Sequence, residues 1–390
     1  MKKKIIAMTL SICLAVGMLT ACGNAADQNT PQNSTESTAK EDTAEDSTGE
    51  DAEPVARDFT FGFSYMSYSD ALGKKIQKVT QQTCDMLGIK TNYAEFGSDM
   101  ENTISTVQNQ IELGVDAVSA SFAYSEILQM CEDNDVIQMY PSGYISDPDM
   151  LEYVAQMSNF GGFISENDYE AAYDAVNTLY EKGCRNIGLI TMPDGLADFM
   201  DQRNQGVRDA VAEHSDMKLI VDYQGFPGDY GTYLSQWLSV YPELDGVVNT
   251  SNDGTCEAAI YTAQAEDKVK LAVFDLQNGT KQAIEDGVVA WCATGQENTW
   301  VISIILAYNQ LCGHDLIEDN TTVLYRPFLY IKSAEDVEIY DKYVDGDIPV
   351  YNEEEVKNLI YDYNPDVTLD DIIAVNEAYS IEDIAARRGE

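Results

Sequence analysis

Four polar residues in the second half of this 390-residue chain have side chains suited to binding a hydroxyl-rich molecule. Asn252 and Asp275 stand at the ends of two predicted strands, Gln296 follows a third, and Arg203 lies in a predicted helix. A carboxylate accepts hydrogen bonds, a guanidinium donates them in a fixed fork, and a side-chain amide does both. The set therefore matches hydroxyl groups, each of which is both donor and acceptor.

Each of these residues also has an ordinary structural interpretation. Arg203 lies close in sequence to three aspartates and suits a surface ion pair with Asp198, Asp201 or Asp209. Asn252 precedes a predicted helix and suits an N-cap, and Gln296 suits a helix cap in the same way. Asp275 precedes an Asn-Gly pair typical of a turn. The strand-end placement of Asn252 and Asp275 favours ligand contact, and the structural alternatives stay open.

The sequence contains little that an enzyme or a metal site needs. It shows no nucleophile elbow and no paired acid and base. Its two histidines, His214 and His314, stand near predicted helix ends, where capping or surface roles are typical. The six cysteines beyond residue 22 show no C-x-x-C pair and no histidine partner at metal spacing, so they are interpreted as buried thiols, with disulfides left open. We expect neither catalysis, nor a metal, nor any other cofactor.

Short β-rich runs alternate with amphipathic stretches from residue 59 onward, which predicts parallel sheets flanked by helices. The predicted strands are 59–65, 91–96, 116–122, 136–140, 153–157, 186–192, 218–223, 246–250, 270–275 and 288–293. The predicted helices are 70–87, 101–113, 124–133, 168–182, 198–213, 230–241, 254–266, 278–286 and 299–312. So many strands exceed one doubly wound unit, and 114–121 resembles 243–251. We therefore predict an α/β fold of two doubly wound parallel-sheet lobes, with ligand bound beyond the carboxyl ends of the strands.

The N-terminal residues indicate export and attachment to a membrane. Three lysines precede an apolar run over 5–21 that is too short for a comfortable membrane span, so 1–21 is a predicted signal peptide. Leu-Thr-Ala-Cys at 19–22 resembles the bacterial lipobox, which implies cleavage before Cys22 and attachment of acyl chains to that residue. Residues 22–56 contain almost no large apolar group and are predicted to form a disordered tether. An ordinary secretory signal or an uncleaved anchor is the alternative.

The charge balance excludes several classes of partner. The chain has 23 basic and 67 acidic residues, a formal net charge of −44, and loss of the three signal-peptide lysines makes it more negative. No stripe of lysine and arginine is available to neutralise phosphates, which argues against nucleic acid. The same charge disfavours binding to anionic lipid headgroups, so the acyl chains have to provide the attachment.

Several short segments, in order over residues 59–325, resemble the type I periplasmic-binding-protein-like family, specifically the ribose- and galactose-type substrate-binding lipoproteins of ABC transporters. They are Asp99-Met-Glu-Asn with Gln108 and Gln110, Gly114-Val-Asp-Ala, Tyr180 to Gly188, Arg203-Asn-Gln-Gly-Val, Ser251-Asn-Asp-Gly, Ala272-Val-Phe-Asp and Asp286 to Gln296. The resemblance implies lobes joined by three chain crossings, near residues 158, 297 and 326. Lobe 1 is then 57–157 plus 297–325, and lobe 2 is 158–296 plus 326–390 with a C-terminal extension.

The resemblance also implies a set of ligand contacts. In the second lobe Arg203, Asn252, Asp275 and Gln296 occupy the positions of the family's polar contacts. The first lobe departs from the pattern, because Tyr140-Pro141 replaces the Asp-Arg pair that follows the fourth strand in the family. In that lobe we predict contacts from Tyr68, Asp70 and Tyr140, since tyrosine rings can stack on a sugar face and hydrogen bond through their hydroxyls.

These observations predict a monomeric, lipid-anchored binding protein on the extracellular or periplasmic face of the membrane, of the Gram-positive surface type. It captures a small polar ligand, expected to be a sugar, and delivers it to the transmembrane subunits of an ABC permease. The alternative is a sensor that presents ligand, including an autoinducer-like furanose, to a chemoreceptor or sensor kinase. An intracellular repressor of the same fold is rejected, because a signal and tether occupy the place of its helix-turn-helix.

Overall fold

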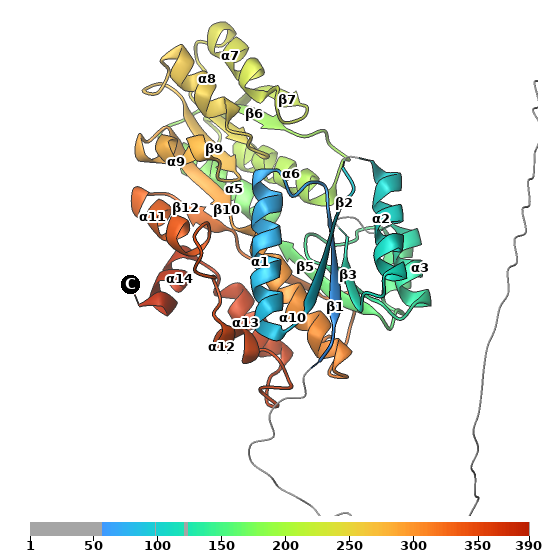
Figure 1. Cartoon of the computed structure of the whole chain (residues 1–390). Helices are drawn as coiled ribbons and strands as arrows, with labels where there is room; N and C mark the ends of the chain where they lie inside the picture. The colour runs from blue at the N-terminus through green and yellow to red at the C-terminus, as the bar shows by residue number, and fades with distance from the viewer. Residues whose placement is uncertain (1–56, 98, 121–123, 390) are drawn as a thin grey trace, which may run out of the picture. The chain divides into compact units, whose positions relative to one another are not determined.

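The computed structural model describes residues 57–97, 99–120 and 124–389, which belong to one compact unit (Figure 1). The predicted signal peptide 1–21, the predicted acylation site Cys22 and the predicted tether 22–56 lie outside the described residues. Among the helices of the described part, none is long and apolar enough to cross a membrane. The six described cysteines are all unpaired, and five of them are buried.

Lobe 1 is built on a six-stranded, fully parallel sheet with the order β11-β5-β4-β3-β1-β2. Its strands are β1 (Thr60–Tyr65), β2 (Lys90–Glu95), β3 (Ala117–Ser119), β4 (Ile137–Tyr140), β5 (Phe160–Glu166) and β11 (Val323–Arg326). The helices that belong to it are α1 (Ala71–Leu87), α2 (Met100–Glu112), α3 (Ser125–Asp133), α4 (Pro148–Val154) and α10 (Thr299–Leu311). The last helix and the last strand come from a second passage of the chain through this lobe.

Lobe 2 repeats the same plan, with the strand order β12-β10-β9-β8-β6-β7. Its strands are β6 (Asn186–Thr191), β7 (Lys218–Gln224), β8 (Gly246–Asn249), β9 (Lys270–Phe274), β10 (Val289–Thr294) and β12 (Leu329–Ile331). Strand β12 is antiparallel to β10, whereas the other pairs are parallel. The helices are α5 (Asp168–Glu181), α6 (Asp198–Glu213), α7 (Tyr230–Val240), α8 (Thr255–Ala263) and α9 (Asn278–Glu285). The prediction of two doubly wound lobes is confirmed.

Helix α1 shows why these sequences form these elements. Asp70 caps its first turn by accepting a hydrogen bond from the backbone N–H of Gly73, and Gly88 ends the helix in the left-handed conformation. Ile76, Val79, Thr80, Thr83, Cys84 and Leu87 are its large buried residues, and their three- and four-residue spacing forms a single inward face. Helix α10, in contrast, is buried all round from Thr299 to Asn309, because it packs on β4, β5 and α1.

The chain crosses between the lobes three times. The first crossing joins β5 to α5 through Glu166 and Asn167, the second joins β10 to α10 at residues 295–298, and the third joins β11 to β12 at residues 327–328. The crossing expected near residue 158 therefore lies after residue 166, because β5 is a strand of lobe 1. Strand β11 keeps Arg326 in lobe 1, one residue beyond the boundary expected at 325.

The strand predicted over 153–157 is wrong. Residues 148–154 form helix α4, started by Asp147 as N-cap and Pro148 as the first helical residue, and the strand follows at 160–166. Two adjacent glycines concealed this strand, since glycines inside a run usually indicate a turn. Gly162 has φ +84°, and a Cβ atom at Gly161 would lie only 3.2 Å from Ile137 Cγ2. The glycines therefore allow a bend and a close approach inside a buried strand.

The C-terminal extension contains α11 (Ala334–Tyr343), α12 (Glu353–Lys357), α13 (Leu369–Glu377) and α14 (Ile381–Arg388). Residues 369–388 form two helices and not one continuous helix, because Ser380 has an extended backbone and caps α14. Helix α11 packs on α9 and α14 on β12, in lobe 2, whereas α12 packs on α1 and α13 on β11, in lobe 1. The extension therefore contacts both lobes. The assignment of the extension to lobe 2 alone, predicted from the sequence, is wrong.

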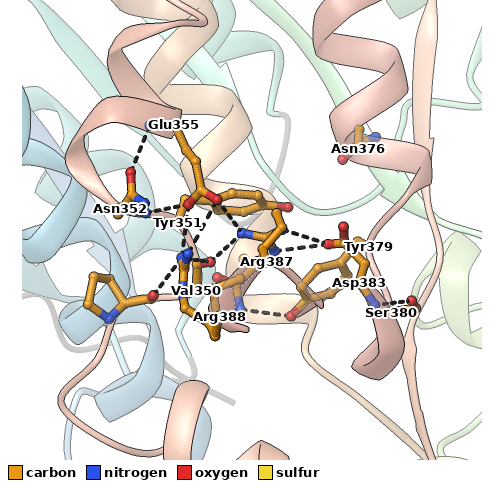
Figure 2. Close-up of polar contacts among 12 residues, drawn as sticks. Val350, Tyr351, Asn352, Glu355, Asn376, Tyr379, Ser380, Asp383, Arg387 and Arg388 are labelled. Atoms are coloured by element: carbon orange, nitrogen blue, oxygen red, sulfur yellow. Dashed lines mark hydrogen bonds and ion pairs between the residues drawn. The ribbon is translucent and has the colours of Figure 1, made fainter. Parts of the chain in front are cut away.

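Two arginines at the end of the chain hold the extension together, as Figure 2 shows. Arg387 donates to the carbonyl of Val350 at 2.7 Å and pairs with Asp383, while Arg388 pairs with Glu355 at 2.9 Å. Arg388 also donates to the carbonyl oxygens of residues 349 and 350. Helix α14 is therefore fixed to the segment that leads into α12.

Candidate functional site

Five polar residues lie near one another at the crossings between the lobes, where their charges interact, and we call them the interlobe cluster. They are Glu166, Asp168, Arg203, Asp275 and Gln296. Glu166 ends β5, Asp275 follows β9 and Gln296 follows β10, so three of the five stand at the carboxyl ends of strands. Sequence reasoning predicted Arg203, Asp275 and Gln296 at the site, and the structure brings these three together.

A buried ion pair is the centre of the cluster. Arg203 Nε donates to Asp168 Oδ1 at 2.6 Å, and Arg203 Nη1 donates to the carbonyl oxygen of Thr250 at 2.8 Å. The two charged side chains are only 6% and 2% exposed. The guanidinium carbon also lies 4.2 Å from the centre of the Phe274 ring, a cation–π contact. The surface ion pair considered for Arg203 is therefore not the arrangement found, since its partner is Asp168, a buried carboxylate at the start of α5.

Asp275 and Gln296 form a second polar pair. The side-chain amide of Gln296 donates to Asp275 Oδ1, and Gln296 Oε1 is buried without a hydrogen-bond partner in the described part of the chain. Asp275 has φ +74°, a conformation that few residues other than glycine adopt and that often occurs at functional sites. Burial raises the pKa of the Asp275 carboxyl, although Arg203 and the bond from Gln296 oppose this. The turn predicted at Asp275 is thus a strand end with a strained backbone, and its carboxylate accepts the hydrogen bond from Gln296.

Glu166 is the functional candidate that sequence reasoning missed. Its side chain is 4% exposed, and no described residue bonds to the buried Oε1 atom. Burial raises the pKa of Glu166 to about 8, the neighbouring Asp168 adds to the rise, and Arg203 opposes it. Elsewhere in this chain, a polar residue at the end of a predicted buried strand indicated a site residue. Glu166 was not found in this way because strand β5 was not predicted.

Asn252 has a supporting position in the structure. Its side-chain nitrogen donates to Glu257 Oε1 at 2.8 Å and to Thr280 Oγ1 at 3.0 Å. Its side-chain oxygen accepts from the backbone N–H of Gly254 at 3.0 Å. The hydrogen-bonding capacity of Asn252 is used inside lobe 2, where it joins the loop after β8 to α8 and α9. We therefore treat Asn252 as a positioning residue.

The three residues predicted in lobe 1 have different positions. The Tyr68 hydroxyl donates to the carbonyl oxygen of Phe63 at 3.0 Å, and its ring packs edge-on against Tyr93 at 5.3 Å. Tyr140 is 8% exposed and packs edge-on against Phe163 within the lobe 1 core. Asp70 is exposed at the N-terminus of α1, and its charge contributes to raising the pKa of Asp275. Asp70 therefore faces the interlobe cluster, whereas both tyrosine rings pack inside lobe 1.

The two lobes contact each other through a side-chain hydrogen bond between α6 and the loop after β4. The Gln202 side chain in α6 of lobe 2 donates to the hydroxyl of Tyr144, in the loop after β4 of lobe 1. Within the described ranges, no group of three cysteine, histidine or acidic side chains is arranged to hold a metal ion. The chemistry that the cluster offers is hydrogen bonding and charge, with more acceptor atoms than donors left for a ligand.

The chain resembles known proteins in structure and not in sequence. No family model matches the chain, and no curated protein matches it in sequence. A periplasmic solute-binding protein of an ABC transporter from Actinobacillus succinogenes, with bound D-allose, superposes with a TM-score of 0.63 at 18% identity, over 72% of this chain and 100% of that one. The binding protein of the arabinose ABC transporter from Shewanella sp. ANA-3, bound to L-arabinofuranose, gives 0.62 at 17% identity, over 73% and 95%.

The fold is also found outside transport. A candidate LacI transcriptional regulator from Bacteroides fragilis matches with a TM-score of 0.57 at 16% identity, over 73% of this chain and 100% of that one. Identities this low establish the fold alone, and each neighbour leaves more than a quarter of this chain unmatched. Two lobes of the same strand order, joined by three crossings, agree with these matches. The chain therefore has the two-lobed α/β fold of the type I periplasmic sugar-binding proteins.

Proposed function

We propose that this protein is a solute-binding protein that captures a small polar ligand, a sugar, between its lobes and delivers it to an ABC permease. The observation that carries the proposal is the interlobe cluster, where the buried acceptor oxygens of Glu166 and Gln296 have no partner among the described residues. The solved neighbours with bound sugars support the choice of ligand class. No chemical conversion of the ligand is proposed.

The unpaired oxygens of Glu166 and Gln296 favour a ligand that donates hydrogen bonds. Leaving a buried acceptor without a donor costs about 1–3 kcal/mol, so native proteins seldom keep such atoms unless a ligand or water satisfies them. A sugar hydroxyl can donate to Glu166 or Gln296 and can accept from Arg203 with the same oxygen atom. Such a ligand satisfies several cluster atoms at once. A ligand of different stereochemistry leaves some of them unpaired, which is how the site discriminates.

Binding at this place also couples ligand capture to lobe movement. Arg203 and Asp275 belong to lobe 2, whereas Glu166 ends a strand of lobe 1 and Asp70 begins a helix of lobe 1. A ligand that contacts both sets binds the closed arrangement of the lobes more tightly than an open one and therefore shifts the population toward it. In the proposed function, the closed form is the one that the permease recognises.

The remaining parts of the proposal rest on the N-terminal sequence. The predicted signal peptide 1–21 and the lipobox-like residues ending at Cys22 support export and acylation, with residues 22–56 as a tether. The proposal places a monomer on the outer face of the cell membrane, attached by its lipid. Radiolabelled palmitate incorporation that is lost in Cys22→Ser tests the attachment.

The binding proposal is tested on chain lacking residues 1–21 and carrying Cys22→Ser, by thermal shift and calorimetry with monosaccharides, disaccharides, nucleosides and amino acids. A ligand at about 100 times its Kd raises the apparent stability by about 2.7 kcal/mol. The variant Asp275→Asn should weaken binding at least tenfold. The control is Asp133→Asn, which removes an equal charge at the exposed end of α3. Full binding by Asp275→Asn, or no binding of any sugar, would contradict the proposal.

A further inference from the structure

The charges around the interlobe cluster do not balance. The acidic side chains in and beside the cluster are Asp70, Glu166, Asp168, Asp275 and Glu297, and the basic ones are Lys75, Arg203 and Arg326. Asp345 also acts on Glu297, and with its partner Lys281 it forms a further, balanced pair. If all are ionised, the carboxylates outnumber the cations by two. The imbalance matters because most of these groups are buried, where water cannot screen a surplus charge.

Each of the three cations already has hydrogen-bond or ion-pair partners. Arg203 is bonded to Asp168 and to the carbonyl of Thr250. Lys75 donates to the hydroxyl of Tyr340 at 2.8 Å and lies 3.6 Å from Asp345. Arg326 donates to the side-chain oxygen of Asn376 and to the hydroxyl of Tyr351, both at 2.9 Å. The hydrogen bonds of these basic side chains therefore go to partners other than Glu166 and Asp275, while the buried Nε atom of Arg326 has no partner among the described residues.

Neither Glu166 nor Asp275 forms an ion pair among the described residues, although Arg326 lies opposite Glu166 in the register of β11 with β5. No described residue bonds to the buried Oε1 atom of Glu166, and Asp275 receives a side-chain bond from the neutral amide of Gln296. That bond uses one of the two N–H donors of Gln296 and leaves its Oε1 atom as a second buried acceptor without a partner in the described structure. The buried side-chain atoms of the cluster that have no partner among the described residues are thus two acceptor oxygens, and both belong to a group rich in carboxylates.

We propose that the ligand carries an ammonium group beside its hydroxyls, as an amino sugar or a similar hydroxylated amine does, and that Glu166 is the carboxylate that selects it. This inference rests on the proposed function and names its substrate class. An ammonium group has three donors and no acceptor, so it fits a site whose open positions are acceptors. It also supplies the positive charge that the cluster lacks.

The titration behaviour of the carboxyls agrees with this assignment. Burial raises the pKa values of Glu166, Asp168 and Asp275, which means that the ligand-free site disfavours their ionised forms. The charged groups that act on Glu166 are Asp168, which raises its pKa, and Arg203 and Arg326, which lower it. A bound ammonium group adds a cation and favours the ionised form of Glu166. Binding should then release a proton from the site.

The neighbours provide a clear contrast for the test, because D-allose and L-arabinofuranose carry no amine. The experiment measures Kd by calorimetry on the chain lacking residues 1–21 with Cys22→Ser. The probes are glucosamine, galactosamine and mannosamine, each compared with its parent sugar and with its N-acetyl derivative, which keeps the nitrogen but removes the charge. We expect at least one amino sugar to bind tenfold or more tightly than both of its neutral counterparts.

The variant Glu166→Gln keeps the size of the side chain and removes its charge, so it should lower this preference at least tenfold, whereas Asp133→Asn should leave it unchanged. An independent readout that needs no variant is proton release. At about pH 6.5, where these amines are already protonated, binding of an amino sugar should release up to about one proton, while binding of a neutral sugar should release none. Calorimetry in buffers of different ionisation enthalpy measures this number.

The outcomes separate the two proposals. If neutral sugars bind as tightly as their amino forms, or if Glu166→Gln keeps the preference, the ammonium assignment is wrong and the proposed function stands. If neither neutral nor amino sugars bind, both proposals are wrong. Preferential binding of an amino sugar with proton release, reduced in Glu166→Gln, supports both.

Discussion

The buried ion pair between Arg203 and Asp168 allows a sharp test of the site's construction. Replacing Arg203 by methionine keeps much of the side-chain volume but leaves the Asp168 carboxylate, 2% exposed, without its cation. The bond to the carbonyl oxygen of Thr250 and the contact with the Phe274 ring are lost as well. Removing one partner of a buried pair typically costs about 3–5 kcal/mol, because the remaining charge is uncompensated. We expect Arg203→Met to lower the free energy of unfolding by an amount in this range.

The double variant Asp168→Asn with Arg203→Met distinguishes this reasoning from a simple loss of packing. A neutral asparagine has a much smaller desolvation penalty than an unpaired carboxylate, so the double variant should be less destabilised than Arg203→Met alone. The same helix offers a matched control in Arg208, which pairs with Asp194 and Asp222 at 3.2 Å and is 30% exposed. Exposed pairs contribute roughly 0–1 kcal/mol, so Arg208→Met should have little effect.

The assay is urea unfolding of the ligand-free protein, followed by circular dichroism and by tryptophan fluorescence to detect any separate unfolding of the lobes. An equal loss of unfolding free energy in Arg203→Met and Arg208→Met would contradict this prediction. An equal loss in the double variant and in Arg203→Met would also contradict it, since the uncompensated charge of Asp168 would then contribute nothing measurable.

Three further predictions concern the hinge and its titrating groups. Tyr379→Phe removes the hydroxyl that accepts from Asn298 and donates to the carbonyl of Gly295, and leaving these buried groups unpaired should cost about 1–3 kcal/mol; an unchanged melting temperature contradicts this. Asp345 pairs with Lys75 of lobe 1 and Lys281 of lobe 2, and these cations lower its pKa although burial acts to raise it. Its contribution, about 1 kcal/mol, should therefore be present above its ordinary pKa and vanish on acidification, so that Asp345→Asn and the unaltered chain have similar stabilities at the acidic end of a pH series. The pKa of Glu166 is raised to about 8, so stability without ligand should fall as pH rises from the ordinary glutamate value toward 8, and a slope that persists in Glu166→Gln assigns the effect to another group.

Strand and helix periodicity was enough to predict most of the architecture. Nine of the ten predicted strands correspond to strands of the structure. Seven of these are largely buried runs bounded by turn residues, and β2 and β7 are partly buried strands at the sheet edges, so both patterns are local. Strand β5 was missed, since its glycines serve the packing against Ile137 and a residue of the second lobe 1 passage, Ile317, and that packing is not encoded nearby in the sequence. The C-terminal helices were predicted in lobe 2 alone, because their contacts with α1 and β11 of lobe 1 are likewise not encoded nearby in the sequence.

Residue type and strand-end position indicated Asp275 and Gln296, because the carboxyl ends of parallel strands meet at one edge whatever the details of packing. Arg203 lies in a helix, and the family resemblance indicated it. The sequence could not indicate which polar atoms remain available. The amide of Asn252 is used by Glu257 and Thr280, and the rings of Tyr68 and Tyr140 pack within lobe 1, all through contacts that depend on the assembled lobes. Only the tertiary structure makes Glu166 a candidate site residue. Its burial, its raised pKa and its unpaired oxygen arise only when the first crossing brings it beside Asp168 and Arg203, since desolvation and charge are properties of surroundings and not of a residue's place in the chain.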